Sequence, residues 1–200
     1  MFKLLAEKIT RFFIARKKIE EKEFEVYVYC FEMLLSTVFN FVLLLAAALI
    51  FRLYYQTAIF SVVFIAARRC MGGYHAKSHL GCMSLLMFFY AVFVVMLYFV
   101  PPHALDIAAI ACSFVVIFPA MLFAPVVHPD NPVSEARAKS LNAFATVGAG
   151  AVTMLSVLCL YLLPCCGAAF SMAYPLASVC ITMLAGKIVY GAPSASSDKN

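Results

Sequence analysis

The run Met33–Phe51, MLLSTVFNFVLLLAAALIF, contains no charged residue. A helix needs about 18 to 20 consecutive apolar residues to cross the hydrocarbon core of a bilayer, which is about 30 Å thick. The run therefore predicts a transmembrane helix. The whole chain agrees, because its 200 residues are 65% hydrophobic and 12% charged, with a mean hydropathy of +0.96. A soluble domain is about half apolar and about a quarter charged. We expect an all-α, polytopic integral membrane protein.

Five further apolar runs follow. Four of them are read as full passes: Ser84–Val100, Ala104–Ala124, Leu141–Leu163 and Ala168–Tyr190. The run Leu53–Ala67 is shorter and contains Gln56, so it is either a sixth pass or a re-entrant segment. We count it as a pass because the positions of the charged residues then agree with a single topology.

The basic residues indicate the orientation. Fourteen of the 15 Lys and Arg residues lie in the N-terminal stretch, in the loop around 68–77, just before Leu141 or near the C-terminus, and Arg52 is the exception. Cytoplasmic loops of membrane proteins carry an excess of Lys and Arg. Six passes with both termini in the cytoplasm satisfy this rule, whereas five passes do not. The loop 68–83 is therefore predicted to be cytoplasmic.

The ends of the chain differ from its centre. Residues 1–30 are predicted to form a cytoplasmic amphipathic helix and an acidic linker, 31–190 the six-pass domain, and 191–200 a disordered cytoplasmic tail. The apolar residues of the first helix recur at helical spacing: Phe2, Leu5, Ile9, Phe12 and Phe13. Such a helix is expected to lie at the membrane surface with anionic lipid as its partner; docking of a peptide substrate is the alternative.

The loop 68–83 carries an imidazole, His75, and a thiol, Cys82. A thiol becomes a strong nucleophile when it loses its proton, and a nearby imidazole is a common base for that step. On one continuous helix these two residues would lie about 10.5 Å apart along the axis, whereas direct proton transfer needs about 3 Å. The segment must therefore fold back or break its helix, and Gly81 is a candidate position. Gly72 and Gly73 also allow a sharp turn before the pair.

Other residues around this pair suggest supporting roles. Arg68 and Arg69 are cations, and basic neighbours lower the pKa of a thiol. The residues just after Cys82 are expected to open a helix, whose N-terminus favours a thiolate and offers free N–H groups to an oxyanion. A carboxylate within an apolar run is a functional candidate, and Glu32 at the start of the first pass could orient His75.

Two other classes of protein stay open. His75, His79, Cys70 and Cys82 could bind a metal, which would favour a metal-binding transporter, although the loop has no acidic residue and its basic flanks repel cations. A non-catalytic peptide exporter is the other alternative; the chain has no phosphate-binding glycine motif for ATP. We expect no cofactor, no metal and no nucleic-acid partner.

Two motifs resemble those of the accessory gene regulator B (AgrB) family of bacterial membrane cysteine endopeptidases, which process quorum-sensing peptide precursors. The first joins Arg68, Gly73, His75, Lys77–Ser78 and Cys82 at fixed offsets. The second is the proline-containing stretch from Ala124 to Pro132, APVVHPDNP, which is similar to a cytoplasmic loop of that family. Tyr74, between Gly73 and His75, is bulkier than expected. The resemblance extends over nearly the whole chain.

The resemblance implies a role for each matched residue. Cys82 would be the nucleophile and His75 its base, with Arg68, Gly73, Lys77 and Ser78 in support. The enzyme would cleave a precursor through a thioester on the cysteine and promote its cyclisation to a thiolactone or lactone. The substrate would be a propeptide with an amphipathic leader and an acidic C-terminal tail, which suits the net charge of +5. The implied location is the bacterial cytoplasmic membrane. A second copy of the chain, as a homodimer, is a further candidate partner.

Overall fold

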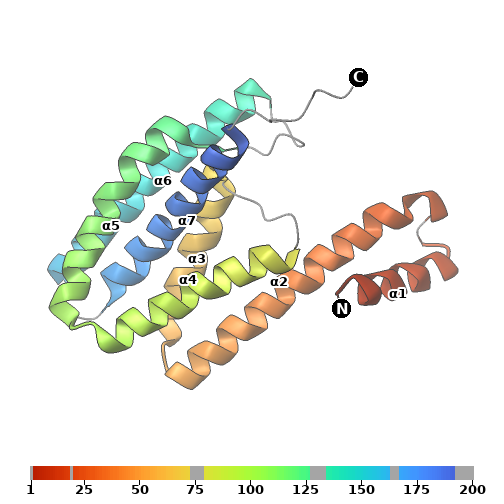
Figure 1. Ribbon diagram of the computed structural model, residues 1–200, viewed down its shortest axis with the longest axis horizontal. Coiled ribbons are helices and arrows are strands. Elements are labelled where there is room, and N and C mark those ends of the chain that lie inside the picture. Colours follow the sequence, from red (N-terminus) through yellow and green to blue (C-terminus); the bar gives the residue numbers. More distant parts are fainter. Residues whose placement is uncertain (1, 19, 73–78, 127–133, 163–166, 192–200) are drawn as a thin grey trace. The chain divides into compact units, whose positions relative to one another are not determined.

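The computed structural model describes residues 2–18, 20–72, 79–126, 134–162 and 167–191. These residues form seven α-helices and one short 3₁₀ helix, with no strand, and Figure 1 labels the α-helices. Their bounds are α1 Phe2–Ala15, η1 Glu21–Glu23, α2 Phe24–Phe51, α3 Tyr54–Met71, α4 His79–Phe99, α5 Pro102–Phe123, α6 Glu135–Leu162 and α7 Ala168–Gly191.

Each of the six predicted passes overlaps one helix, from α2 to α7, and four of them exceed its bounds by a single residue. In the described residues, four segments are long and apolar enough to cross a membrane: Glu21–Phe51, Pro102–Phe123, Ala136–Leu162 and Ala168–Val189. Ser84–Phe99 in α4 is a shorter apolar helix. The predicted class, an all-α polytopic membrane protein, is confirmed. The helices begin or end beyond several predicted limits; α3, for example, continues past Ala67 to Met71.

The chain divides into two compact units. The first unit comprises Met1–Arg52 and Ala76–Phe88, and the second comprises Leu53–His75 and Phe89–Asn200. Helix α4 is therefore shared, with its N-terminal half in the first unit and its C-terminal half in the second.

In the first unit, α1 packs against α2. The ring of Phe2 meets Phe39 edge-on at 5.4 Å between centroids, and Phe13 stacks on Phe31 at 5.7 Å. Ala6 is fully buried. The predicted apolar stripe of α1 is thus partly covered by α2. Other apolar side chains of α1 stay exposed: Leu4, Leu5 and Phe12.

In the second unit, α7 is the central helix and contacts α3, α5 and α6. Buried residues make up 67% of its apolar segment, compared with 28% in α5 and 22% in α6. Many of the buried residues of α7 are small, which lets neighbouring helices approach closely: Ala168, Ala169, Ser171, Ala173 and Ser178. Close packing of small residues is what holds helices together in lipid, because lipid offers no hydrophobic driving force between them.

An aromatic cluster joins α3, α4 and α7 inside this unit. Phe60 and Phe93 lie 4.9 Å apart between ring centroids, and Phe93 stacks on Phe170 at 5.8 Å. These three rings are fully buried. The hydroxyl groups of Thr57 and Tyr90 share a hydrogen bond of 2.7 Å at the edge of the cluster. The cluster fixes α3 against α7, and α3 is the helix that leads into the loop carrying His75.

Candidate functional site

The structure describes only part of the predicted site. His75, Gly73, Lys77 and Ser78 lie outside the described residues. Cys82 lies in the first turn of α4, and only its backbone is described. The helix was expected to open after Cys82, but α4 begins earlier, at His79. The free N–H groups of a helix are those of its first turn. Because α4 begins at His79, Cys82 lies within that turn and not before it.

The helix break is also earlier than expected. Gly81, the residue proposed as the break, lies inside α4. The interruption comes instead at the end of α3, where Gly72 follows Met71. Gly72 has φ +68° and ψ −139°, a conformation that side chains resist and glycine accepts. The expectation that Gly72 adopts backbone angles that other residues resist is confirmed.

Gly72 also pairs with a segment distant in sequence. Val126 donates a backbone hydrogen bond of 3.0 Å to the carbonyl oxygen of Met71, and Gly72 and Val126 form an isolated parallel β-bridge. A Cβ atom placed on Gly72 would overlap the carbonyl oxygen of Val126. The pairing brings together the beginnings of the two sequence motifs, the loop with His75 and the proline-containing stretch. Sequence reasoning noted both motifs and both glycines but not their contact.

The segment Ala124–Val126 is itself held in place from α6. The side-chain amide of Asn142 donates to the carbonyl oxygen of Met121 at 3.2 Å and also to that of Ala124. These oxygens belong to the last turn of α5 and the residue after it, where carbonyl groups have no partner within the helix. Asn142 therefore caps α5 and fixes the residue that precedes Pro125.

Arg68 connects α3 to α7. Its Nη1 donates a hydrogen bond of 2.7 Å to Oγ1 of Thr182, which is buried. The Thr182 hydroxyl in turn donates to the carbonyl oxygen of Val179 at 2.8 Å. Arg68 was expected to act on the thiol of Cys82. The structure shows Arg68 in contact with α7. Its expected action on Cys82 stays a prediction, because the side chain of Cys82 lies outside the described part of the chain.

The remaining candidates stay predictions. Glu32 lies half-buried on α2 in the first unit, and no contact with His75 is described. Cys70 is a free, half-buried thiol on α3. The described residues contain no group of three His, Cys, Asp or Glu side chains that could hold a metal. His75 and the side chains of His79 and Cys82 lie outside the described part of the chain.

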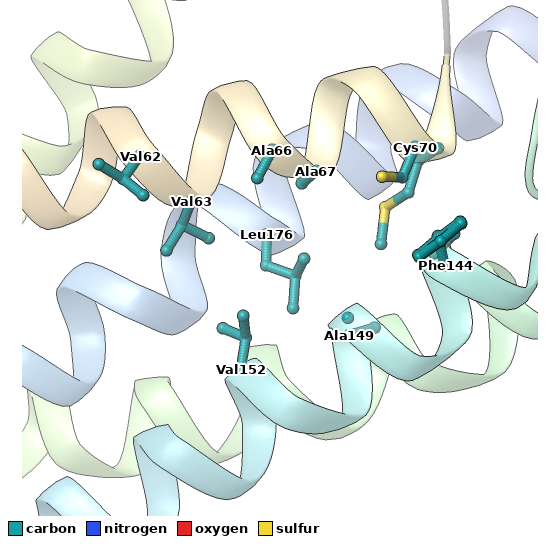
Figure 2. Close-up of a pocket in the computed structure, with 12 residues that line it drawn as sticks. Val62, Val63, Ala66, Ala67, Cys70, Phe144, Ala149, Val152 and Leu176 are labelled. Carbon is teal, nitrogen blue, oxygen red and sulfur yellow. The ribbon is translucent and has the colours of Figure 1, made fainter. Parts of the chain in front are cut away.

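An apolar cavity of about 180 Å³ lies between α3, α6 and α7, beside the end of α3. Figure 2 shows Cys70 and Phe144 at one end of it and Val62 at the other. The lining comprises Val62, Val63, Ala66, Ala67, Cys70, Met71, Phe144, Ala145, Gly148, Ala149, Val152 and Leu176. Sequence reasoning missed this cavity. Its signal was the small residues on α3 and α6, which leave space where larger side chains would interdigitate.

The comparisons with known proteins agree with the resemblance seen in the motifs. The family model for accessory gene regulator B matches residues 6–186, a range that includes every predicted site residue and all seven helices in whole or in part. No curated protein and no solved structure matches the chain. A match over this share of the chain shows the family: the protein belongs to the accessory gene regulator B (AgrB) family, whose members take part in the processing of quorum-sensing peptides.

Proposed function

We propose that this protein is a membrane-embedded cysteine endopeptidase that cleaves a quorum-sensing peptide precursor and promotes its cyclisation. The observation that carries the proposal is the match of the family model over residues 6–186, which contains the pair His75 and Cys82. The position of Cys82 in the first turn of α4 supports it. The positive end of a helix favours a thiolate over a thiol, and its free N–H groups can bind an oxyanion.

The proposed chemistry has two acyl transfers. In the first, His75 accepts the proton of the Cys82 thiol, and the thiolate attacks the carbonyl carbon of the scissile peptide bond. The C–N bond breaks, and the C-terminal fragment leaves as an amine with the proton from His75. The N-terminal part of the precursor remains on Cys82 as a thioester.

In the second transfer, a Cys or Ser side chain of the precursor attacks the thioester carbonyl. A thiolactone or lactone forms, the C–S bond to Cys82 breaks, and the cysteine regains its proton. Water attacking the same carbonyl would release a linear acid instead. A thioester keeps the acyl group activated, so a site that excludes water and holds the nucleophile close favours the ring.

The same proposal extends to substrate and location. The precursor has an amphipathic leader and an acidic tail, which the net charge of +5 and the basic loops attract. The enzyme lies in the bacterial cytoplasmic membrane with both termini in the cytoplasm, as the distribution of Lys and Arg favours. Anionic lipid binds the basic face of α1.

The decisive experiment is precursor cleavage by purified variants in vesicles. Cys82→Ala should abolish cleavage and Cys82→Ser should leave a trace, because an alkoxide forms far less readily than a thiolate. His75→Ala should reduce the rate by roughly 10²- to 10⁴-fold, the usual contribution of a general base. Cys70→Ala is the matched control, since Cys70 is a free thiol of the same region that lines the apolar cavity; it should cleave normally. Full activity in Cys82→Ala would end the peptidase proposal and leave the exporter.

A further inference from the structure

We propose that the segment Ala124–Val126 is a backbone brace that positions the catalytic loop, and that Gly72 is the positioning residue on which the brace acts. The proposal rests on the proposed function, because it concerns the loop that carries His75. It assigns a role to the first three residues of the proline-containing stretch, which the chemistry of the two acyl transfers leaves unused.

The first support is the fit between Gly72 and Val126. Two independent features exclude any side chain at position 72: the φ of +68° and the overlap of a Cβ with the carbonyl oxygen of Val126. The backbone of Met71 and Gly72 is paired with Val126 through the bridge and the 3.0 Å hydrogen bond. Such a close backbone approach fixes the direction in which the chain leaves α3.

The second support is the anchoring of the brace. Asn142 is a polar residue at the start of a long apolar stretch of α6, where an unpaired amide would be unfavourable. Both of its described hydrogen bonds go to the carbonyl oxygens that precede Pro125. Lys187 on α7 adds a cation–π contact with Phe123, the residue just before the brace, with its Nζ 3.3 Å from the ring centroid. The brace is thus held by α5, α6 and α7 together.

The third support is the short distance along the chain from the brace to the base. His75 follows Gly72 by three residues, which can span at most about 11 Å. The direction of the backbone at Gly72 therefore limits where the imidazole of His75 can lie. A displacement of about 1 Å in such a group can lower a rate by about 100-fold.

The test compares two glycines. Gly72→Ala should lower kcat for precursor cleavage by about 100-fold with little change in KM, because the base is displaced while the binding surface is kept. Gly150→Ala on α6 is the matched control, since a Cβ there meets no atom within 4 Å; it should cleave as the parent does. Both variants need the same level in the membrane and the same elution in detergent.

A second readout separates positioning from a general loss of structure. The rate of alkylation of Cys82 is measured against pH in a variant whose other cysteines are replaced by Ala or Ser. When His75 is in place, the midpoint should lie below that of a free thiol, and Gly72→Ala should move it upward towards about 8.5. A midpoint unchanged by Gly72→Ala would overturn the brace, as would normal cleavage.

Val126 supplies a pair of variants that leave Gly72 intact. Val126→Pro removes the N–H that donates to Met71 and should reproduce both effects, whereas Val126→Ala keeps the N–H and should be near normal. If Gly72→Ala does not accumulate, this pair decides: equal activity of the two variants would overturn the brace. Cys82→Ala separates the two proposals. If it is inactive while Gly72→Ala and Val126→Pro are normal, the peptidase stands and only the brace fails.

Discussion

Replacing Thr182 by valine should weaken the link between α3 and α7. Thr182 accepts a hydrogen bond of 2.7 Å from Nη1 of Arg68 and is 3% exposed. Valine keeps the shape of threonine and replaces its hydroxyl with a methyl group, which removes both the acceptor for Arg68 and the donor to the carbonyl oxygen of Val179. The variant therefore tests the hydrogen bonds of this hydroxyl, and a double-mutant cycle with Arg68→Gln isolates the one to Arg68.

The expected loss of stability in Thr182→Val follows from two ranges of hydrogen-bond energy. A hydrogen bond that involves a charged group contributes about 1.5 to 3 kcal/mol in soluble proteins. Side-chain hydrogen bonds between membrane helices average about 0.6 kcal/mol and reach about 1.7. Arg68 is charged but only partly buried, so we expect a loss of about 1 to 2 kcal/mol, which changes the ratio of folded to unfolded protein by about 5- to 30-fold.

The assay is unfolding of the purified protein in mixed detergent micelles, in a double-mutant cycle with Arg68→Gln. The coupling between the two substitutions should equal most of the loss, since each removes one partner of the same bond. Thr37→Val is the matched control, because the Thr37 hydroxyl donates within its own helix to Met33 at 2.8 Å and is exposed. It should change the free energy of unfolding by less than about 0.5 kcal/mol. A coupling below about 0.3 kcal/mol between positions 68 and 182 would refute the reasoning.

Two further predictions concern chemistry and topology. A precursor that lacks its ring-closing Cys or Ser should still be cut and should accumulate as a thioester on Cys82 that hydroxylamine releases at neutral pH; intact mass spectrometry detects the adduct, and finding only hydrolysed product after a rapid quench would count against the acyl-enzyme. A membrane-impermeant maleimide added to intact cells should label neither Cys70 nor Cys82 and is expected to reach Cys165 or Cys166, which lie outside the described residues. Labelling of Cys82 from outside would invert the orientation assigned from the Lys and Arg residues.

The fold class followed from composition and the lengths of the apolar runs. Apolar runs of this length form helices in a bilayer, because every backbone polar group must be paired within the segment. Helix limits were less predictable. The run Leu141–Leu163 was read as one pass, whereas α6 begins at Glu135. Hydrogen bonding along a helix continues beyond the membrane into polar residues, so apolarity marks the membrane-crossing part and not the whole helix.

The candidate pair, His75 and Cys82, was also recognisable from sequence, because the residue types and their offsets carry the signal. Cys82 was expected to precede a helix, but it lies inside the first turn of α4, because the helix starts at His79 and includes Gly81. A glycine inside a helix and a glycine that ends one look alike in sequence. Only their neighbours in space distinguish them, and at Gly72 the neighbour is the carbonyl oxygen of Val126.

Tertiary structure alone decided the contacts between residues that lie far apart in the chain. The bridge from Gly72 to Val126 and the hydrogen bond from Arg68 to Thr182 join segments whose sequences contain no sign of each other. Backbone pairing uses groups that every residue carries, so it leaves no pattern of residue types to detect. The choice of partner depends on how α3, α5, α6 and α7 pack, and that packing follows from the shapes of many side chains acting together.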